Sequence, residues 1–261
     1  MPHFPAMPNS DQGTALVTGA ARRIGRAIAQ ALAGGGWAVA AHYHRSGAGA
    51  EELVAAITDA GGRAAAFQAD LTSEEETRGV MAAAAKALGP VTCLVNNASL
   101  FEEDGPDTAG RALWDRHMAV NLRAPFVLGQ ELVLGLADGG TANIINLIDQ
   151  RVTNLTPYFT SYTLSKSGLW TLTQTQAMAL APLVRVNAIG PGPTLRAERQ
   201  TPEQFERQFQ AAPLRRAVDP EEISGAVRFI LASPSMTGQM ITLDAGQHLG
   251  YSTPERPEPD F

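Results

Sequence analysis

The stretch that decides the fold is residues 14–25, TALVTGAARRIG, where a short apolar run leads directly into a glycine-containing turn. The run has the length of a buried strand, and the alanine-rich segment RRIGRAIAQALAGG that follows has the spacing of an amphipathic helix. Backbone N–H groups and the positive end of the helix dipole converge at such a turn, and glycine lets the chain approach a phosphate closely. The stretch therefore predicts a pyrophosphate site, although a tight turn without a ligand has the same local pattern.

The same alternation of strand-like and helical segments continues along most of the chain. Later strand-like runs are WAVAAHYH, RAAAFQAD, VTCLVNNA, NIINLI, VRVNAIG and MITLD, and the helical segments include 110–137, 158–180 and 220–231. This order predicts βαβ units, and hence an α/β fold of the Rossmann type: one doubly wound parallel sheet with helices on both faces. We expect one domain over 13–250, with irregular tails at 1–12 and 251–261. The segment 195–216 has no recognisable pattern.

Composition limits the possible functions. The chain has 261 residues and a net charge of −6, which does not favour binding to nucleic acid or to an anionic membrane. Neither a secretory signal nor an apolar run long enough to span a bilayer is recognisable, so we expect a cytoplasmic protein. The single cysteine, Cys93, lies in an apolar run, where a buried, inert thiol is expected.

The second strand-like run ends in a basic cluster. Where an NAD site usually presents an acidic residue to the ribose 2′-hydroxyl, this chain has His44, Arg45 and Ser46, with Arg22 and Arg23 in the glycine turn. The planar fork of arginine suits phosphate oxygens, so the sequence predicts NADP(H) as the cofactor. A solvated basic face is the alternative. His42 and His44 have the spacing of a metal pair, but no third ligand clusters with them, and we expect no metal.

Polar residues also follow the third and fourth strand-like runs, where the ligand crevice of such a sheet lies. The predicted cofactor contacts there are Asp70, Leu71, Asn97, Ala98 and Ser99. Asn121 stands in the interior of a predicted helix, where asparagine is unfavourable by propensity. It marks either a local kink with a bound water or a satisfied buried amide.

Tyr162 and Lys166 stand four residues apart in a predicted helix, so both side chains should lie on one face. An ammonium group close to a phenol favours the phenolate, so we expect Lys166 to lower the pKa of Tyr162 and make it a better acid. The same spacing arises by chance on helix surfaces. However, the chain has only two lysines among its 20 basic residues, which makes the position of Lys166 notable.

Four motifs occur in a specific order: T-G-x-x-x-x-I-G at 18–25, N-N-A at 96–98, Y-x-x-x-K at 162–166, and Pro191-Gly192. In this order the chain resembles the short-chain dehydrogenase/reductase family over residues 13–250. The resemblance implies a nicotinamide cofactor and a homo-oligomer, either a tetramer or a dimer. It implies Tyr162 as proton donor, Lys166 on the nicotinamide ribose, and Asn121 in a water-linked proton path. It also places Gly19, Ile24, Gly25, Pro191, Gly192 and Thr194 at the cofactor.

Three departures from the family pattern narrow the resemblance. Arg23 and Ser99 stand where the family usually has glycine, and Asp149 stands where it has serine, thirteen residues before the tyrosine. These departures resemble the pteridine reductases and dihydromonapterin reductases, and Phe101 matches an aromatic residue that stacks on the pterin ring in that subgroup. The predicted substrate residues are therefore Ser99, Phe101, Asp149 and Tyr162.

Asp149 has a chemical role in that setting, because a carboxyl group can donate a proton or a hydrogen bond to a ring nitrogen. The alternative is that Asp149 only caps the loop after the fifth strand. The sequence thus predicts an NADPH-dependent reductase of a C=N or C=O bond in a small molecule, most plausibly a dihydropteridine. A carbonyl reductase of a sugar, acyl or aromatic ketone, and a non-catalytic NADP(H)-binding regulator, are the alternatives.

Overall fold

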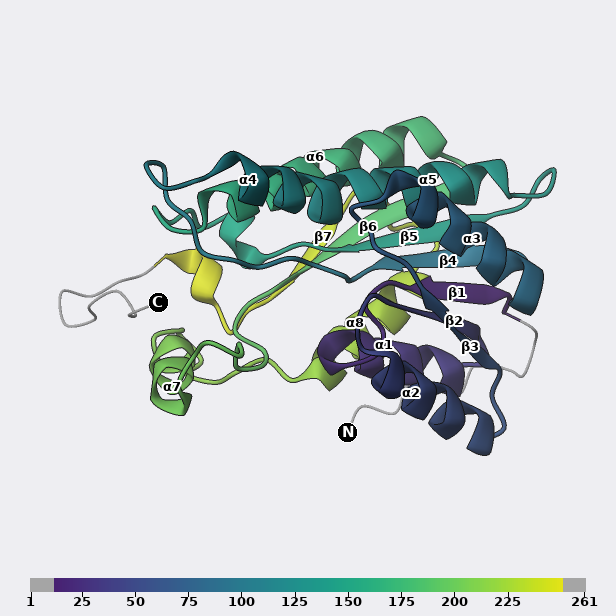
Figure 1. Cartoon of the computed structure of the whole chain (residues 1–261), viewed down its shortest axis with the longest axis horizontal. Coiled ribbons are helices and arrows are strands. Elements are labelled where there is room, and N and C mark those ends of the chain that lie inside the picture. The colour runs from purple at the N-terminus through teal and green to yellow at the C-terminus, as the bar shows by residue number, and fades with distance from the viewer. Residues whose placement is uncertain (1–11, 251–261) are drawn as a thin grey trace.

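The computed structural model describes residues 12–250 and contains one parallel sheet of seven strands in the order β3-β2-β1-β4-β5-β6-β7 (Figure 1). The strands are β1 (Thr14–Val17), β2 (Ala38–Tyr43), β3 (Ala64–Gln68), β4 (Val91–Asn96), β5 (Ala142–Leu147), β6 (Val184–Pro191) and β7 (Met240–Leu243). The predicted fold class is confirmed. The two tails, at 1–11 and 251–261, lie outside the described residues.

Helices cover both faces of the sheet (Figure 1). On one face α1 (Arg23–Gly34), α2 (Gly47–Asp59) and α8 (Pro220–Leu231) enclose a core that includes Ile28, Leu53 and Ile230. On the other face α3 (Glu74–Leu88), α5 (Ala124–Leu134) and α6 (Thr160–Leu180) enclose a second core around Leu94 and Ile144. Because the central strands are buried on both sides, their sequences are mostly apolar rather than strictly alternating.

Strand order places the ligand crevice. The chain runs outward from β1 to β2 and β3 and then returns to β4 on the other side of β1. The connections after β1 and β4 therefore diverge, which leaves an opening at the carboxyl edge between them. The thiol of Cys93, in β4, is buried, and burial raises its pKa to about 12, as expected for an inert cysteine.

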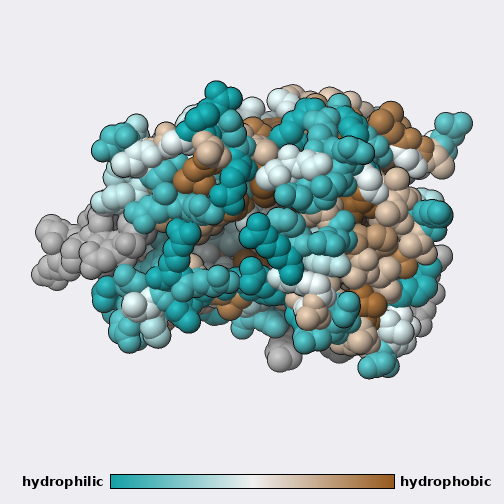
Figure 2. All heavy atoms as spheres, viewed as in Figure 1, coloured by the Kyte–Doolittle hydropathy of each residue, from teal (hydrophilic) through white to brown (hydrophobic). Residues whose placement is uncertain are grey.

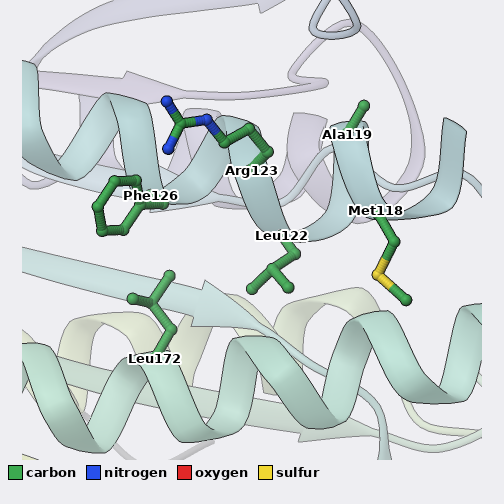
Figure 3. Close-up of a pocket in the computed structure, with 6 residues that line it drawn as sticks. All are labelled: Met118, Ala119, Leu122, Arg123, Phe126 and Leu172. Carbon is green, nitrogen blue, oxygen red and sulfur yellow. The ribbon is translucent and has the colours of Figure 1, made fainter. Parts of the chain in front are cut away.

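The predicted helical stretch at 110–137 is two helices joined by a π-turn. The first helix is α4 (Arg111–Met118), the π-turn η1 spans Ala119–Arg123, and α5 follows directly. A π-turn adds one residue to the helix and rotates the following side chains. Figure 3 shows Leu122 of this turn pointing toward Leu172 of α6 across a small apolar pocket, while Asn121 is fully buried.

The segment without a recognisable pattern, 195–216, contains a helix, α7 (Pro202–Gln210). A capping box begins it: Thr201 accepts a hydrogen bond from the backbone of Gln204, and the Gln204 side chain accepts one from the backbone of Thr201. None of the α7 residues is buried, and the helix projects from the body of the molecule (Figure 1). We call 195–216 the lid. No helix within residues 12–250 is both long enough and apolar enough to cross a membrane.

Candidate active site

A cleft of about 1100 Å³ opens at the carboxyl edge of the sheet, between the body of the molecule and the lid. Figure 2 shows hydrophilic side chains gathered around a hollow on this face. Apart from Asn121, every predicted site residue lines this cleft: Gly19, Arg22, Arg23, Ile24, Gly25, His44, Arg45, Ser46, Asp70, Leu71, Asn97, Ala98, Ser99, Phe101, Asp149, Tyr162, Lys166, Pro191, Gly192 and Thr194. Residues far apart in the sequence are thus brought together in one crevice.

The glycine turn fits a pyrophosphate. Gly19 has a φ of +65°, which strains a residue with a side chain, and a Cβ atom on Gly25 would lie 2.3 Å from the Gly19 carbonyl oxygen, where there is no room for it. The first turn of α1 has no acidic residue, and its leading N–H groups lack partners within the helix. His42 fixes the turn, because its Nδ1 accepts the Gly19 N–H at 3.1 Å. An anion at this turn would meet the positive end of the helix dipole.

The two arginines of the glycine turn bind the lid in this structure. The Arg23 guanidinium donates to the backbone oxygens of Leu195 and Arg196, at 2.8 and 2.9 Å. Arg22 forms an ion pair with Glu198 at 3.1 Å. Both arginines line the cleft as predicted, but their guanidinium groups join the turn to the lid, a contact that the sequence did not reveal.

The end of β2 forms the far side of the cleft. His44 and Arg45 are exposed there, and His44 lies 3.6 Å from the carboxylate of Asp70. Asp70 accepts a hydrogen bond from the backbone of Thr72, which lowers the pKa of its carboxyl group. His42 does not pair with His44, because its second ring nitrogen bonds the Ala69 carbonyl oxygen.

Tyr162, Asp149 and Lys166 meet at the floor of the cleft. The Tyr162 hydroxyl donates to Asp149 Oδ2 at 2.8 Å, and Lys166 Nζ donates to the Leu147 carbonyl oxygen at 2.8 Å. Lys166 Nζ lies 5.8 Å from the centre of the Tyr162 ring, so the two side chains share one helix face as predicted.

The predicted effect of Lys166 on its neighbour is wrong for this arrangement. Burial, together with the adjacent Asp149 carboxylate, raises the pKa of Tyr162 well above its ordinary value. Burial also lowers the pKa of Lys166, to about 8. The Lys166 ammonium faces a carbonyl oxygen rather than the phenol oxygen, and the carboxylate is the nearer charge, so the phenol is held in its protonated form.

The contacts of Asp149 include the predicted loop cap and a hydrogen bond to Tyr162, whereas its role as a donor to the substrate stays a prediction. One carboxylate oxygen accepts the backbone N–H of Arg151 at 2.9 Å and thereby caps the short 3₁₀ helix η2 (Gln150–Val152). The other oxygen accepts the Tyr162 hydroxyl. The loop-capping bond thus fixes the carboxylate beside the Tyr162 hydroxyl.

Asn121 lies behind the cleft wall rather than in it. Its amide bonds both the N–H and the C=O of Leu100, at 2.9 and 3.0 Å, and donates to Ser165 Oγ at 3.0 Å. Its oxygen also accepts the Ser99 hydroxyl at 3.2 Å. The structure shows a satisfied buried amide that holds the loop after β4, and it stands in a π-turn, a local distortion of the helix.

Several cleft residues were not predicted. Phe159 stacks on Phe101 with ring centres 4.4 Å apart, and the Arg151 guanidinium lies 4.9 Å from the Phe159 ring. Phe101 also meets the edge of Tyr162, at 4.7 Å. The proximity of Phe159 and Arg151 to Asp149 and Tyr162 in sequence was a usable signal. The glutamines of the lid, Gln200, Gln204 and Gln208, line the opposite wall.

A Rossmann sheet with a phosphate turn, and a buried tyrosine and lysine at the crevice floor, define an oxidoreductase that uses a nicotinamide dinucleotide. The chain belongs to the short-chain dehydrogenase/reductase family: the family model described as enoyl-(acyl carrier protein) reductase matches residues 19–248. The predicted family and cofactor class are confirmed.

Individual relatives agree with this assignment. An uncharacterised oxidoreductase of Methylorubrum extorquens is 34% identical over 89% of this chain and 96% of its own. The crystal structure of FolM alternative dihydrofolate reductase 1 from Brucella suis, in complex with NADP, is 50% identical, with a TM-score of 0.90 over 94% of this chain and 99% of its own. The corresponding Brucella canis complex with NADP is 48% identical, with a TM-score of 0.91 over 97% of this chain and 100% of its own.

Proposed function

We propose that this protein is an NADPH-dependent reductase of a dihydropteridine. The observation that carries the proposal is the 2.8 Å hydrogen bond between Tyr162 and Asp149, beside the partly exposed ring of Phe101. A flat heteroaromatic ring can stack on Phe101 while its nitrogen atoms meet the Tyr162–Asp149 pair. Similarity to the two Brucella dihydrofolate reductases supports a pterin-type substrate.

The pair suits reduction of a C=N bond. Such a reduction adds a hydride to carbon and a proton to nitrogen, and bound NADPH would supply the hydride. Tyr162 carries the proton, and Asp149 orients the phenol through their shared hydrogen bond. Lys166 would hold the nicotinamide ribose.

The positive charge at the end of β2 favours NADPH over NADH, because NADPH carries an additional phosphate on its ribose. Arg45 and Ser46 line the cleft at the end of β2, where an NAD site would present a carboxylate. The NADP complexes of the Brucella proteins support this choice. The Arg45→Asp variant should weaken NADPH binding at least tenfold more than NADH binding, and equal losses would argue against a 2′-phosphate contact.

The decisive experiment measures NADPH oxidation with dihydrobiopterin, dihydromonapterin and dihydrofolate, beside a panel of ketones. We expect turnover of at least one pterin, and we expect Asp149→Ser to reduce that rate more than any ketone rate. Turnover of ketones alone would identify a carbonyl reductase. A relative from Eggerthella lenta is named 3beta-hydroxysteroid dehydrogenase 1, so this alternative has a precedent among similar proteins. Binding of NADPH without any turnover would identify a regulator.

We also propose that the protein acts in the cytoplasm as a homo-oligomer, a tetramer or a dimer. Large apolar side chains are exposed on α5 and α6: Leu134 is 76% exposed and Met178 is 74% exposed. Light scattering coupled to gel filtration would measure the mass, and a monomer of 27.6 kDa would contradict the proposal.

A further inference from the structure

Outside the residues with proposed catalytic roles, a buried polar cluster joins three parts of the chain. Asp104 belongs to the loop between β4 and α4, His117 to α4, and Ser161 to the first turn of α6. All three are buried: Asp104 is 6% exposed, and His117 and Ser161 are 0% exposed. Burying polar side chains is costly unless each is fully hydrogen-bonded, so their partners define what the cluster does.

Asp104 caps the helix that carries Tyr162. Phe159, just before α6, has a φ of 58° and provides no side-chain cap. Instead the backbone oxygen of Asp104 accepts the Phe159 N–H at 2.8 Å, and its carboxylate accepts the Ser161 N–H at 3.1 Å. The N–H groups of Phe159 and Ser161 are thus bonded by a residue 57 positions before Ser161, and its negative charge faces the positive end of the helix dipole.

His117 completes the cluster, and its tautomer follows from its contacts. Its Nε2 accepts the backbone N–H of Glu102 at 3.3 Å, so Nδ1 carries the proton of the neutral ring. Nδ1 then donates to Ser161 Oγ at 2.6 Å, and the Ser161 hydroxyl donates to the Asp104 carboxylate. Burial lowers the pKa of His117 and so favours this neutral form.

The cluster sets the positions of Tyr162 and Phe101 relative to each other. Tyr162 directly follows Ser161, and its ring meets the His117 ring at 6.0 Å between centres. Phe101 lies three residues before Asp104 in the same loop and contacts Tyr162. A shift of the loop relative to α6 would therefore change the angle between the phenol and the stacking ring.

We propose that Asp104, Ser161 and His117 are positioning residues: they lock the loop that carries Phe101 to the helix that carries Tyr162 and thereby aim the phenol at the substrate. The proposal rests on the proposed function only in that Tyr162 is the proton donor. It applies equally to a pterin and to a ketone. Misplacing a catalytic group by about 1 Å can cost on the order of 100-fold in rate.

The test compares two isolated hydroxyl deletions in the same helix. Ser161→Ala removes the link between His117 and Asp104, whereas Thr173→Val removes a buried hydroxyl that bonds Asn146 and the Leu169 carbonyl oxygen, away from the cleft. We expect Ser161→Ala to lower kcat on the order of 10- to 100-fold with unchanged Kd for NADPH, and Ser161→Thr to restore most of the rate. Thr173→Val should lower Tm only.

A double-mutant cycle separates positioning from general destabilisation. In the Tyr162→Phe background, Ser161→Ala should change the residual rate less than twofold, because its effect acts through the absent phenol. Equal fold-losses in both backgrounds would overturn the proposal, and so would an unchanged kcat in Ser161→Ala and Asp104→Asn at a temperature where both are folded.

A spectroscopic measurement keeps this test independent of the substrate. In protein labelled with ¹³C at tyrosine Cζ, Tyr162→Phe assigns the Tyr162 resonance among the four tyrosines. Ser161→Ala should shift that resonance, and Thr173→Val should not. Absence of turnover with every substrate would overturn the proposed function, whereas an unmoved Tyr162 resonance in Ser161→Ala would overturn the positioning role.

Discussion

Tyr162 holds the one proton that the proposed chemistry requires. Its hydroxyl is buried and bonded to Asp149, and both features raise its pKa, so the group is protonated across the physiological range. Replacing it by phenylalanine removes the proton and keeps the ring that contacts Phe101. We expect Tyr162→Phe to lower kcat by about 10²- to 10⁴-fold, the usual contribution of a general acid. NADPH binding, followed by cofactor fluorescence, should change little, and retained turnover would remove Tyr162 from the mechanism.

The lowered pKa of Lys166 predicts that activity falls at alkaline pH. Burial lowers its pKa to about 8, so the ammonium form predominates below pH 8 and disappears above it. If the cation holds the cofactor ribose, kcat/KM for NADPH should fall about tenfold per pH unit above pH 8. The comparison is Lys166→Arg, which stays charged to much higher pH and should be slower but lack this fall. A flat wild-type profile up to pH 10 would show that the charge of Lys166 is not required.

Arg23 stands where the family usually has glycine, and its contacts explain why an arginine is tolerated there. It has a φ of 57°, in the left-handed region where glycine is favoured, and a residue with a side chain there costs about 1 kcal/mol or more. Its guanidinium makes two hydrogen bonds to the lid, which a glycine cannot make. The strained backbone is thus offset by a contact between the cofactor turn and the lid.

At the scale of elements, α7 depends on its capping box more than other helices do. None of its residues is buried, so little packing supports it, and the bonds between Thr201 and Gln204 close its first turn. Loss of an N-cap costs about 1 kcal/mol. We expect Thr201→Ala to raise KM for the substrate up to about fivefold, with faster hydrogen exchange in 202–210 and a nearly unchanged Tm.

The chain offers a matched control for this prediction. Asp219 begins the other capping box, on α8, which packs in the core through Ile223 and Ile230. Asp219→Ala should therefore lower Tm and leave KM unchanged, and Thr201→Ser should behave as the wild type. An unchanged KM in Thr201→Ala would mean that α7 does not contact the substrate.

The elements differ in how far their sequences predict them. The sheet was predictable because β1, β4 and β5 are short, mostly apolar runs that alternate along the chain with longer helical segments. The helix α7 was missed because its apolar residues are too few for a periodic pattern, although Thr201 and Gln204 stand at capping-box spacing. The π-turn at Asn121 and the cap supplied by Asp104 depend on distant partners, Ser165 and Ser161, which no local pattern reveals.

At the scale of the whole molecule, two buried histidines predict how stability depends on pH. His42 fixes the glycine turn and His117 fixes the loop after β4, and burial lowers the pKa of both. In the unfolded chain each would protonate near pH 6.5, whereas the folded chain resists protonation until lower pH. The unfolded state therefore binds more protons below about pH 6.5, so this contribution to stability is complete above pH 6.5 and is lost as the pH falls toward the folded pKa values.

The expected loss is at most about 1.4 kcal/mol per pH unit for each histidine between pH 6.5 and the folded pKa. Urea unfolding at pH 7.5 and pH 5.5 would measure it. Carboxylates also titrate at acid pH, so the comparison that isolates the histidines is with His42→Asn and His117→Asn, each of which should show a smaller loss than the wild type. Each histidine accepts a backbone N–H, from Gly19 or Glu102, through a ring nitrogen that must stay unprotonated. The same loss of stability in all three proteins would therefore show that protonation of these two rings does not contribute to the pH dependence of folding.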